Sequence, residues 1–567
     1  MMKCITVDRR EWPGTEADVL LDIIRRWFSD RSIVEAAEGG GGEFVLKLRM
    51  NGAISGEGFN TVRETEKCVV IEACCIRGIY AGTGQFLRYC RIEEDGFDPC
   101  CTEGLSMPRK EVRGMYFATH FYNFYHSAEI EKIERYVEDI SLWGLNSVVV
   151  WFDMHHYKSI EDPLAQEMIL RLRMILNAVK KVGMGACLGI LSNEGFGESP
   201  PELRADWTSG HDGYFAEPVG HYHVELCPSK PEGLALILKN REDMLKQLSD
   251  MDFEYIWLWP YDQGGCTCSE CAPWGSNGFL KTSRELAELT GRYFPKSKLI
   301  LSCWDFDEFI HGEWNAFKKA FSNEPKWIDY LLVEPRGKYS GFPVLKGELH
   351  GLNLVGFPEI SMMFATPWGG FGANPLPTFL KDIWSICGDE LEGGFPYSEG
   401  IFEDMNKFMM SRLYWTGGSD TGTALKEYLS AYVSLDLADE LYHAMLLLER
   451  GISRARVEAD GTRRSYPDPS EYDGEGVRYV IEDTSGIDEA YDVIMGCDEK
   501  ISARMKQSWR WRIILLRAVI DYELYHNGFL PNKRCIESYR ELIWIYSASD
   551  ADWAVRPPIT KQTGGTE

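Results

Sequence analysis

The sequence predicts an α/β protein whose centre is a (β/α)8 barrel, preceded by a small α/β domain and followed by a helical domain. Between residues 113 and 410, eight strand-like apolar runs alternate with segments of helical periodicity. Eight such units over about 300 residues fit a barrel with some insertions. No glycine-rich dinucleotide fingerprint follows the first run, so a doubly wound open sheet is only the second choice.

The 567 residues divide into three regions, and we expect boundaries at 1–110, 111–415 and 416–567. The first region contains short β-rich runs at 43–50 and 68–74, together with an amphipathic segment at 16–28, which predict a small α/β domain. The last region contains helical segments at 424–451 and 488–526 around an acidic loop that is rich in glycine and proline.

Eight candidate strands build the predicted barrel. They are Gly114–His120, Ser147–Phe152, Ala186–Leu191, Tyr255–Pro260, Leu299–Trp304, Tyr330–Glu334, Leu352–Pro358 and Ile383–Cys387. Helices are predicted between several of them, at 163–182, 231–248 and 282–293 among others. Another helix has Ile130, Ile133, Val137 and Ile140 on one face, and Ser127 is its expected N-cap.

Composition excludes several classes of partner. Lys and Arg number 60 against 87 Asp and Glu, so the net charge of −27 disfavours nucleic acid and anionic membranes. No apolar run is long enough to span a membrane, and the N-terminus lacks the apolar core of a signal peptide. The 16 cysteines include adjacent pairs, such as Cys74 and Cys75, which indicates reduced thiols and predicts a cytoplasmic protein.

Carboxylates stand beside aromatic residues after nearly every predicted strand. In a (β/α)8 barrel these positions lie at the catalytic end. Aromatic faces stack on sugar rings and carboxylates bind hydroxyls or transfer protons, so the pattern favours glycoside cleavage by two carboxyl groups. Some of these carboxylates are expected to cap helices instead, and some of the aromatic side chains to pack inside the barrel. The residues predicted to contact substrate are Trp151, Asp153, His155, Glu194, Trp259, Tyr261, Gln263, Trp304, Asp305 and Glu399.

Two groups of residues raise the question of a metal. His155 and His156 are adjacent, and on a strand they would point to opposite faces, so we expect one of them to bind a substrate hydroxyl instead. Cys266, Cys268 and Cys271 form a compact C-x-C-x-x-C. A closed zinc site needs a fourth ligand, which Cys227 or Cys303 could supply through the fold. The alternatives are free thiols or a local disulfide, and no catalytic metal or cofactor is expected.

The segment from Arg77 to Tyr89, followed by Arg113-Gly-Met-Tyr, resembles the junction between the N-terminal domain and the barrel in family 20 β-N-acetylhexosaminidases and family 67 α-glucuronidases. The segments at 259–271 and 397–406 resemble a bacterial, α-glucuronidase-like branch of the same group. The resemblance covers roughly residues 40–410. It implies a glycoside hydrolase that takes a terminal uronic acid or N-acetylhexosamine, and a homodimer by analogy with the α-glucuronidases.

The resemblance also has a departure. The hexosaminidases end the fourth strand with an adjacent Asp-Glu pair, whereas here Gln263 follows Asp262. The α-glucuronidase order, with one acid after the fourth strand and two carboxylates on later strands, fits Asp262, Glu334 and Glu359 better. The resemblance therefore implies that Asp262 is the acid or the residue that stabilises the reacting sugar. Glu359 is then its partner and Glu334 supports them, while Glu194 and Glu399 are reserve candidates.

Three hypotheses remain. The first is an exo-acting glycoside hydrolase that cleaves an oligosaccharide or glycoside. In it, Arg336 and Lys338 either bind the carboxylate of a uronic acid or are surface charges. The second is a non-catalytic carbohydrate-binding protein on the same fold, which the change to Gln263 keeps open. The third, a metal-dependent hydrolase that uses the cysteines, is disfavoured because three thiolates suit a closed structural site.

Overall fold

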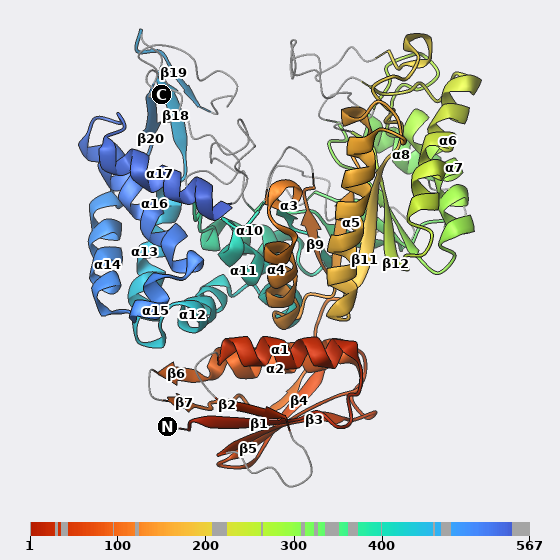
Figure 1. Ribbon diagram of the computed structural model, residues 1–567. Coiled ribbons are helices and arrows are strands. Elements are labelled where there is room, and N and C mark those ends of the chain that lie inside the picture. The colour runs from red at the N-terminus through yellow and green to blue at the C-terminus, as the bar shows by residue number, and fades with distance from the viewer. Residues whose placement is uncertain are drawn as a thin grey trace.

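The computed structural model describes residues 2–28, 32–35, 43–93, 96–119, 124–206, 224–261, 265–307, 312–321, 327–334, 351–360, 372–398, 400–457, 460–465 and 478–546. Three regions follow one another along the chain: a small α/β region, a closed barrel and a largely helical region. Figure 1 shows the first region below the barrel and the C-terminal helices beside it. This arrangement confirms the predicted fold class.

The N-terminal region is a six-stranded sheet with the order β2-β1-β3-β5-β4-β8. Two helices pack on it, and their apolar faces include Leu20 and Ile24 of α1 and Phe86 of α2. The elements are β1 (Cys4–Asp8), α1 (Thr15–Trp27), β2 (Ser32–Glu35), β3 (Phe44–Met50), β4 (Phe59–Thr65), β5 (Cys68–Ala73), α2 (Ile76–Tyr89), the hairpin β6 (Arg91–Glu93) and β7 (Gly96–Asp98), and β8 (Gly104–Ser106).

Eight parallel strands close the barrel, because the last strand in the order pairs with the first and the first pairs with the second. The strands are β9 (Val112–Phe117), β10 (Ser147–Trp151), β11 (Gly185–Leu191), β12 (Phe253–Trp259), β13 (Lys298–Ser302), β14 (Tyr330–Val333), β15 (Asn353–Gly356) and β16 (Leu391–Gly394). A short strand, β17 (Tyr397–Ser398), continues along β9. Seven of the eight predicted strands are present with shifts of a few residues.

The prediction for the eighth strand is wrong. Residues 383–387 are the end of helix α10 (Pro377–Cys387), where Leu380, Ile383 and Trp384 form a buried face of helical spacing. The strand is Leu391–Gly394, which ends in two glycines. A Cβ on Gly394 would lie 2.2 Å from the carbonyl oxygen of Gly356. Close contact between backbones therefore requires glycine there, and glycine has low β-propensity, so the strand gave no sequence signal.

The remaining helices of the barrel cover its outer face. They are α3 (Phe124–Ser127), α4 (Ile130–Leu142), α5 (Pro163–Lys181), α6 (Pro231–Gln247), α7 (Gly278–Tyr293) and α8 (Glu313–Phe321), and short 3-10 turns lie at Met154–His156 and Pro201–Leu203. Ile133, Val137 and Ile140 form the buried face of α4 as predicted, whereas Ile130 at the start of the helix is only partly buried. Ser127 is not the N-cap of α4, because it ends α3 and Glu129 occupies the cap position.

The C-terminal region is mainly helical but differs from the prediction in three places. The segment 424–451 is broken by a 3-10 turn at Leu435–Leu437, and the segment 488–526 is divided into three helices. A three-stranded antiparallel sheet also interrupts the helices. The elements are α11 (Asp404–Thr416), α12 (Thr421–Tyr432), α13 (Ala438–Arg450), β18 (Arg454–Val457), β19 (Arg463–Ser465), β20 (Arg478–Ile481), α14 (Ile487–Lys500), α15 (Ala503–Lys506), α16 (Trp509–His526) and α17 (Lys533–Tyr546).

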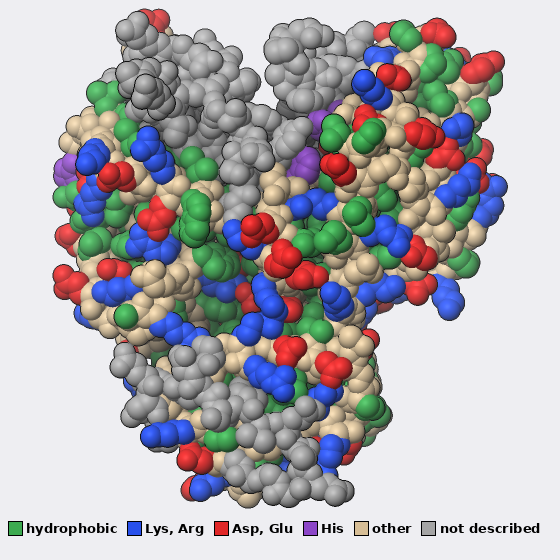
Figure 2. All heavy atoms as spheres, viewed as in Figure 1, with side chains coloured by type: hydrophobic (Ala, Val, Ile, Leu, Met, Phe, Trp, Pro, Cys, Tyr) green, Lys and Arg blue, Asp and Glu red, His purple; other side chains and the backbone are tan. Residues whose placement is uncertain are grey.

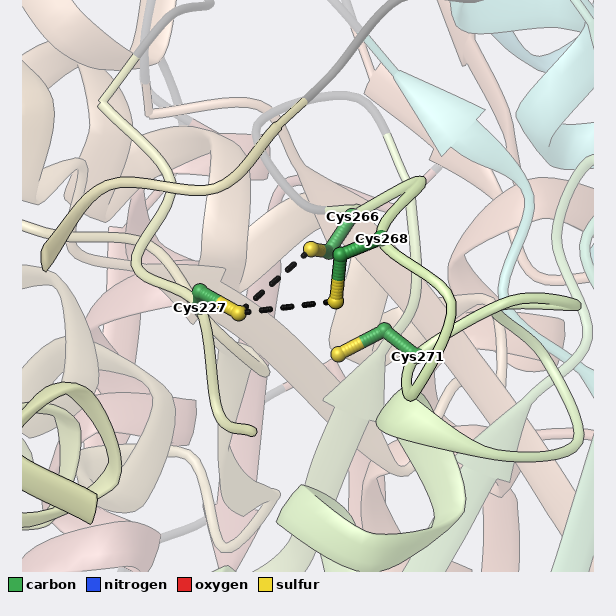
Figure 3. Close-up of side chains that lie close together, drawn as sticks. All are labelled: Cys227, Cys266, Cys268 and Cys271. Carbon is green, nitrogen blue, oxygen red and sulfur yellow. Dashed lines mark hydrogen bonds between the residues drawn. The ribbon is translucent and has the colours of Figure 1, made fainter. Parts of the chain in front are cut away.

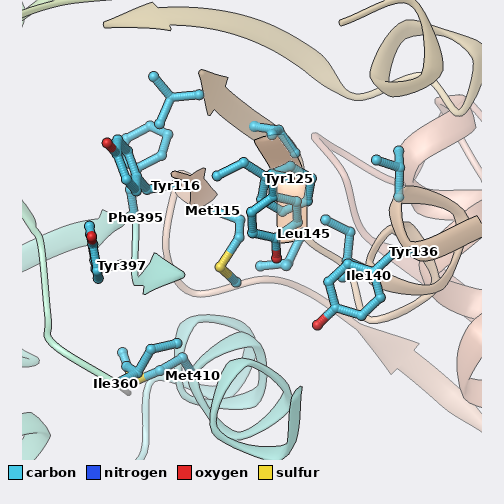
Figure 4. Packing of buried hydrophobic residues seen from close by; sticks show 14 of the residues in the cluster. Met115, Tyr116, Tyr125, Tyr136, Ile140, Leu145, Ile360, Phe395, Tyr397 and Met410 are labelled. Carbon is cyan, nitrogen blue, oxygen red and sulfur yellow. The ribbon is translucent and has the colours of Figure 1, made fainter. Parts of the chain in front are cut away.

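Aromatic side chains fill the barrel and join it to α3 and α4. Inside the barrel the rings of Tyr116 and Tyr397 stack with their centroids 5.2 Å apart. On the outer side of β9, Phe117 stacks on Tyr125 at 3.8 Å. Figure 4 shows Tyr116, Phe395 and Tyr397 on one side of this strand and Tyr125 and Tyr136 on the other. One continuous hydrophobic core therefore extends from the barrel interior to its helices.

The surface mixes charges of both signs. On the face seen in Figure 2, acidic and basic side chains are interspersed over the barrel helices and the N-terminal region. Among the helices that the structure describes, none combines the length and apolarity required to cross a membrane.

Candidate active site at the barrel mouth

The C-terminal ends of the barrel strands bring most of the predicted site residues to one end of the molecule. Glu334 and Glu359 follow β14 and β15, which are neighbours in the barrel, and the amide of Phe357 donates to the carbonyl of Val333 at 2.9 Å. Both carboxylates are buried, with exposed fractions of 6% and 7%. Glu359 also forms a parallel bridge with Tyr397. The two predicted catalytic glutamates thus lie on adjacent strands at the mouth.

Several predicted residues lie outside the part of the chain that the structure describes. These are Asp262, Gln263, Arg336, Lys338 and Glu399. Asp262 follows Tyr261, two residues beyond the end of β12, the fourth strand of the barrel. β15, which leads to Glu359, is the seventh strand. Their roles remain predictions.

Asp153, His155 and Glu194 form a buried polar network with Arg241 of α6. His155 Nδ1 lies 2.8 Å from Glu194 Oε1 and 3.2 Å from Asp153 Oδ1. Arg241 Nη2 donates to Glu194 Oε2 at 2.8 Å and to the carbonyl of Leu191 at 2.6 Å. Both oxygens of Glu194 are therefore engaged by basic groups. This geometry makes Glu194 a residue that positions His155.

The network changes the titration of His155. Burial, the largest influence, would lower its pKa, but the charge of Asp153 and the hydrogen bond with Glu194 together raise it. The two carboxylates therefore favour the charged form of this ring relative to a free imidazole. Asp153 Oδ2 also lies 3.0 Å from His156 Nε2, so the same carboxylate contacts both histidines.

The expectation that His155 and His156 lie on a strand and point to opposite faces is wrong. Residues 154–156 form a 3-10 turn and not a strand, so their rings lie side by side with centroids 4.3 Å apart. Asp153, His155 and His156 can bring one ligand atom each within 4.8 Å of one another. The same holds for Cys227, Cys266, Cys268 and Cys271. These are the two groups, among the described residues, that could hold a metal ion.

Tryptophans form the floor of the mouth. Trp259 stacks on Trp257 at 5.8 Å and on Trp304 at 5.5 Å, and its edge meets Trp151 at 6.3 Å. Phe357 packs against the same group, 5.0 Å from Trp259. The rings are largely buried against one another. Barrel packing therefore accounts for much of the aromatic content that the sequence offered as a sugar platform.

Tyr261 is fully buried, and its hydroxyl donates to Glu313 Oε1 at 2.5 Å. Glu313 also accepts from the amides of Gly275 and Asp307, at 2.7 Å and 3.1 Å. Burial raises the pKa of Glu313, and this effect exceeds the lowering by the three hydrogen bonds. The contact connects the loops that follow β12 and β13, and it gives Tyr261 a scaffolding role. Asp305, predicted to bind substrate, lies in the second of these loops with a positive φ of 57°.

Three charged residues near the mouth were missed by the sequence analysis: Arg241, Glu313 and Glu225. Arg241 had a signal, because it falls on the same helical face as Ile237, Met244 and Leu245, and a cation on an apolar face needs a partner. Glu225 had none, since it lies far from any predicted strand and reaches the mouth by bridging to Glu194. Burial raises the pKa of Glu225 well above its usual value, and the charge of Glu194 adds to this.

No protein-family model matches the chain, and no curated protein matches its sequence. Solved structures do match its fold. A family GH115 4-O-methyl-α-glucuronidase with specificity for decorated arabinogalactans aligns with a TM-score of 0.61 and 11% identity, over 99% of this chain and 78% of that one. A GH138 enzyme targeting pectin rhamnogalacturonan II aligns with a TM-score of 0.57 and 9% identity, over 96% and 92%.

The GH20 β-N-acetylhexosaminidase from Streptomyces coelicolor A3(2) aligns with a TM-score of 0.50 and 13% identity, over 79% of this chain and 92% of that one. The chain thus has the fold of these glycoside hydrolases. At such identities the likeness extends to the fold alone.

Proposed function

We propose that the chain is an exo-acting glycoside hydrolase that removes a terminal uronic acid or N-acetylhexosamine from a glycoside or oligosaccharide. The observation that carries the proposal is the pair Glu334 and Glu359, two buried carboxylates after neighbouring strands at the mouth of a tryptophan-floored barrel. Glycoside cleavage needs two carboxyl groups that flank the scissile bond. Solved glycoside hydrolases with the same fold support this reading.

A uronic acid is the preferred substrate. The match to the α-glucuronidase covers 99% of this chain and so includes the C-terminal helices, whereas the match to the hexosaminidase covers 79%. The change to Gln263 also removes the second acid of the hexosaminidase pattern. In this proposal Asp262 protonates the leaving oxygen or stabilises the reacting sugar, Glu359 acts opposite it, and Glu334 supports them.

A panel of aryl glycosides bearing uronic, N-acetylamino and neutral sugars tests the proposal. We expect cleavage of an α-glucuronide first. On that substrate, Asp262→Asn and Glu359→Gln should each lower the rate on the order of 10²–10⁴-fold, because each removes an acid or base. The matched control is Glu232→Gln at an exposed position of α6, which should keep the wild-type rate.

Two results would contradict this assignment. If both Asp262→Asn and Glu359→Gln keep more than about a tenth of the activity, the catalytic assignment of these two residues is wrong. If no glycoside of the panel is cleaved while calorimetry detects sugar binding, the chain is a carbohydrate-binding protein on a glycosidase fold.

A further inference from the structure

Four cysteine sulfurs converge beside the barrel mouth. Cys266, Cys268 and Cys271 come from the loop after β12, and Cys227 comes from the segment that leads to α6. Figure 3 shows the four side chains with their sulfur atoms pointing toward one another. All four sulfurs lie within 4.8 Å of one another, and three of the residues are buried. A residue 39 positions upstream thus completes the C-x-C-x-x-C segment.

The distances between the sulfurs match a tetrahedral metal site. Cys227 Sγ lies 3.6 Å from Cys266 Sγ and 3.8 Å from Cys268 Sγ. A zinc–sulfur bond is about 2.3 Å, so the edge of a regular zinc–sulfur tetrahedron is about 3.8 Å. A disulfide would require about 2.05 Å. The four cysteines are also free of disulfides in the structure.

A hydroxyl group lies next to the cluster. Ser229 Oγ is 3.0 Å from Cys227 Sγ and 3.4 Å from Cys268 Sγ. A hydroxyl in this position can donate to a thiolate, and such outer hydrogen bonds orient the ligands of metal sites. The loop itself is turned by the amide of Cys271, which donates to the carbonyl of Cys268 at 3.0 Å.

We propose that Cys227, Cys266, Cys268 and Cys271 bind one zinc ion in a closed, structural site. Four sulfur ligands in tetrahedral arrangement select zinc or iron, and zinc is the usual metal of closed structural sites. Binding replaces four S–H bonds by four Zn–S bonds and releases four protons to solvent, with no change of oxidation state. Because all four positions are filled by protein, the ion has no open site for a substrate.

The zinc site would fix two segments of the active-site rim to each other. Asn193 lies between them: its Nδ2 donates to the carbonyls of Leu226 and Gly265 at 2.9 Å and 2.8 Å. The amide of Gly265 donates back to Asn193 Oδ1 at 2.9 Å. Leu226 and Gly265 each directly precede a cysteine of the cluster. The ion therefore strengthens the contact that Asn193 makes between the segments at Leu226 and Gly265.

Metal analysis of the purified chain tests this directly. The full chain, prepared under reducing conditions without added metal, should contain about one zinc per molecule and little iron. Cys227→Ser should lose most of this zinc. The matched control is Cys303→Ser, because Cys303 is equally buried near the mouth but does not belong to the cluster. It should keep the full zinc content.

A second measurement covers the case in which Cys227→Ser does not fold. Zinc is removed from the wild-type chain with a chelator, and Co²⁺ is added in its place. The visible spectrum of tetrahedral thiolate-bound Co²⁺ should appear with about one equivalent, whether or not the chain cleaves any glycoside.

Three results would overturn the proposal. They are less than about 0.1 zinc per wild-type chain with no cobalt spectrum, equal zinc in the wild type and a folded Cys227→Ser, or iron in place of zinc. A disulfide among the four cysteines, found by mass spectrometry after alkylation under native conditions, would also contradict it.

Discussion

The two ends of the barrel differ in how their charges are balanced. At the N-terminal end, where the first region packs, Glu57 accepts from Arg113 and also, at 2.8 Å, from Arg77. The guanidinium of Arg77 also donates to Glu254 at 2.5 Å and to the carbonyl of Gly183 at 2.7 Å. Cations and carboxylates alternate here, so each charge has a partner.

Carboxylates are in excess at the C-terminal end. The buried ones in the described part of the mouth include Asp153, Glu194, Glu225, Asp305, Glu313, Glu334 and Glu359. Arg241 and His155 both contact Glu194, which is fully buried.

The titration of two glutamates shows what this difference means. Burial would raise the pKa of Glu57, but Arg113 and Arg77 outweigh it and the pKa is lowered. At the mouth, burial raises the pKa of Glu225 and its acidic neighbour raises it further. Neighbouring cations thus favour the ionised form of Glu57 at the N-terminal end, whereas burial beside a second carboxylate favours the protonated form of Glu225 at the mouth.

The largest effect on stability is expected from removing a charge at the N-terminal end of the barrel, where the charges are paired. Glu57→Ala leaves the buried guanidinium of Arg113 without its carboxylate and should lower the free energy of unfolding by about 3 kcal/mol. Urea denaturation measures it, and Glu66→Ala on an exposed turn should stay close to wild type. Activity per folded molecule should not change. A loss of turnover without a loss of stability would remove the distinction between the ends.

An intermediate effect is expected at the scaffold of the mouth. Tyr261→Phe removes the hydroxyl that donates to buried Glu313 and should lower the free energy of unfolding by about 1–3 kcal/mol. The control is Tyr293→Phe, whose hydroxyl donates to Glu242 at 3.0 Å in an accessible place and should matter less. The KM of the α-glucuronide should stay within about twofold. A large rise in KM with unchanged stability would instead place Tyr261 against the substrate, as the sequence predicted.

A third effect depends on pH. A carboxyl whose pKa is raised by folding holds its proton in the folded chain and releases it on unfolding above about pH 4.5, so its burial costs stability as the pH rises. Glu225→Gln removes this cost. Its stability relative to wild type should increase between pH 5 and pH 7, by at most about 1.4 kcal/mol per pH unit.

Denaturation at both pH values measures this change, with Glu202→Gln at an exposed position as control. The same difference between variant and wild type at both pH values would show that Glu225 is ionised in the folded chain.

Much of the fold could be predicted from the sequence, because it is encoded locally. Seven barrel strands are runs of apolar residues between helices, and burial on both faces of a parallel strand requires such runs. The positions of Glu334 and Glu359 at the mouth follow from the same rule, since residues after parallel strands meet at one end. The eighth strand could not be found, because Gly393 and Gly394 are selected by contact with neighbouring backbones.

The sequence by itself therefore determined the order of the elements and the end of the barrel at which the candidate site lies. It also supplied three of the four cysteines, which stand within six consecutive positions. Only the tertiary structure decided that Cys227 and not Cys303 joins them, that Arg241 neutralises Glu194, and that Glu225 reaches the mouth. Each of these contacts joins residues 31 or more positions apart. Periodicity reports which face of an element is buried, but long-range contacts depend on how the elements pack.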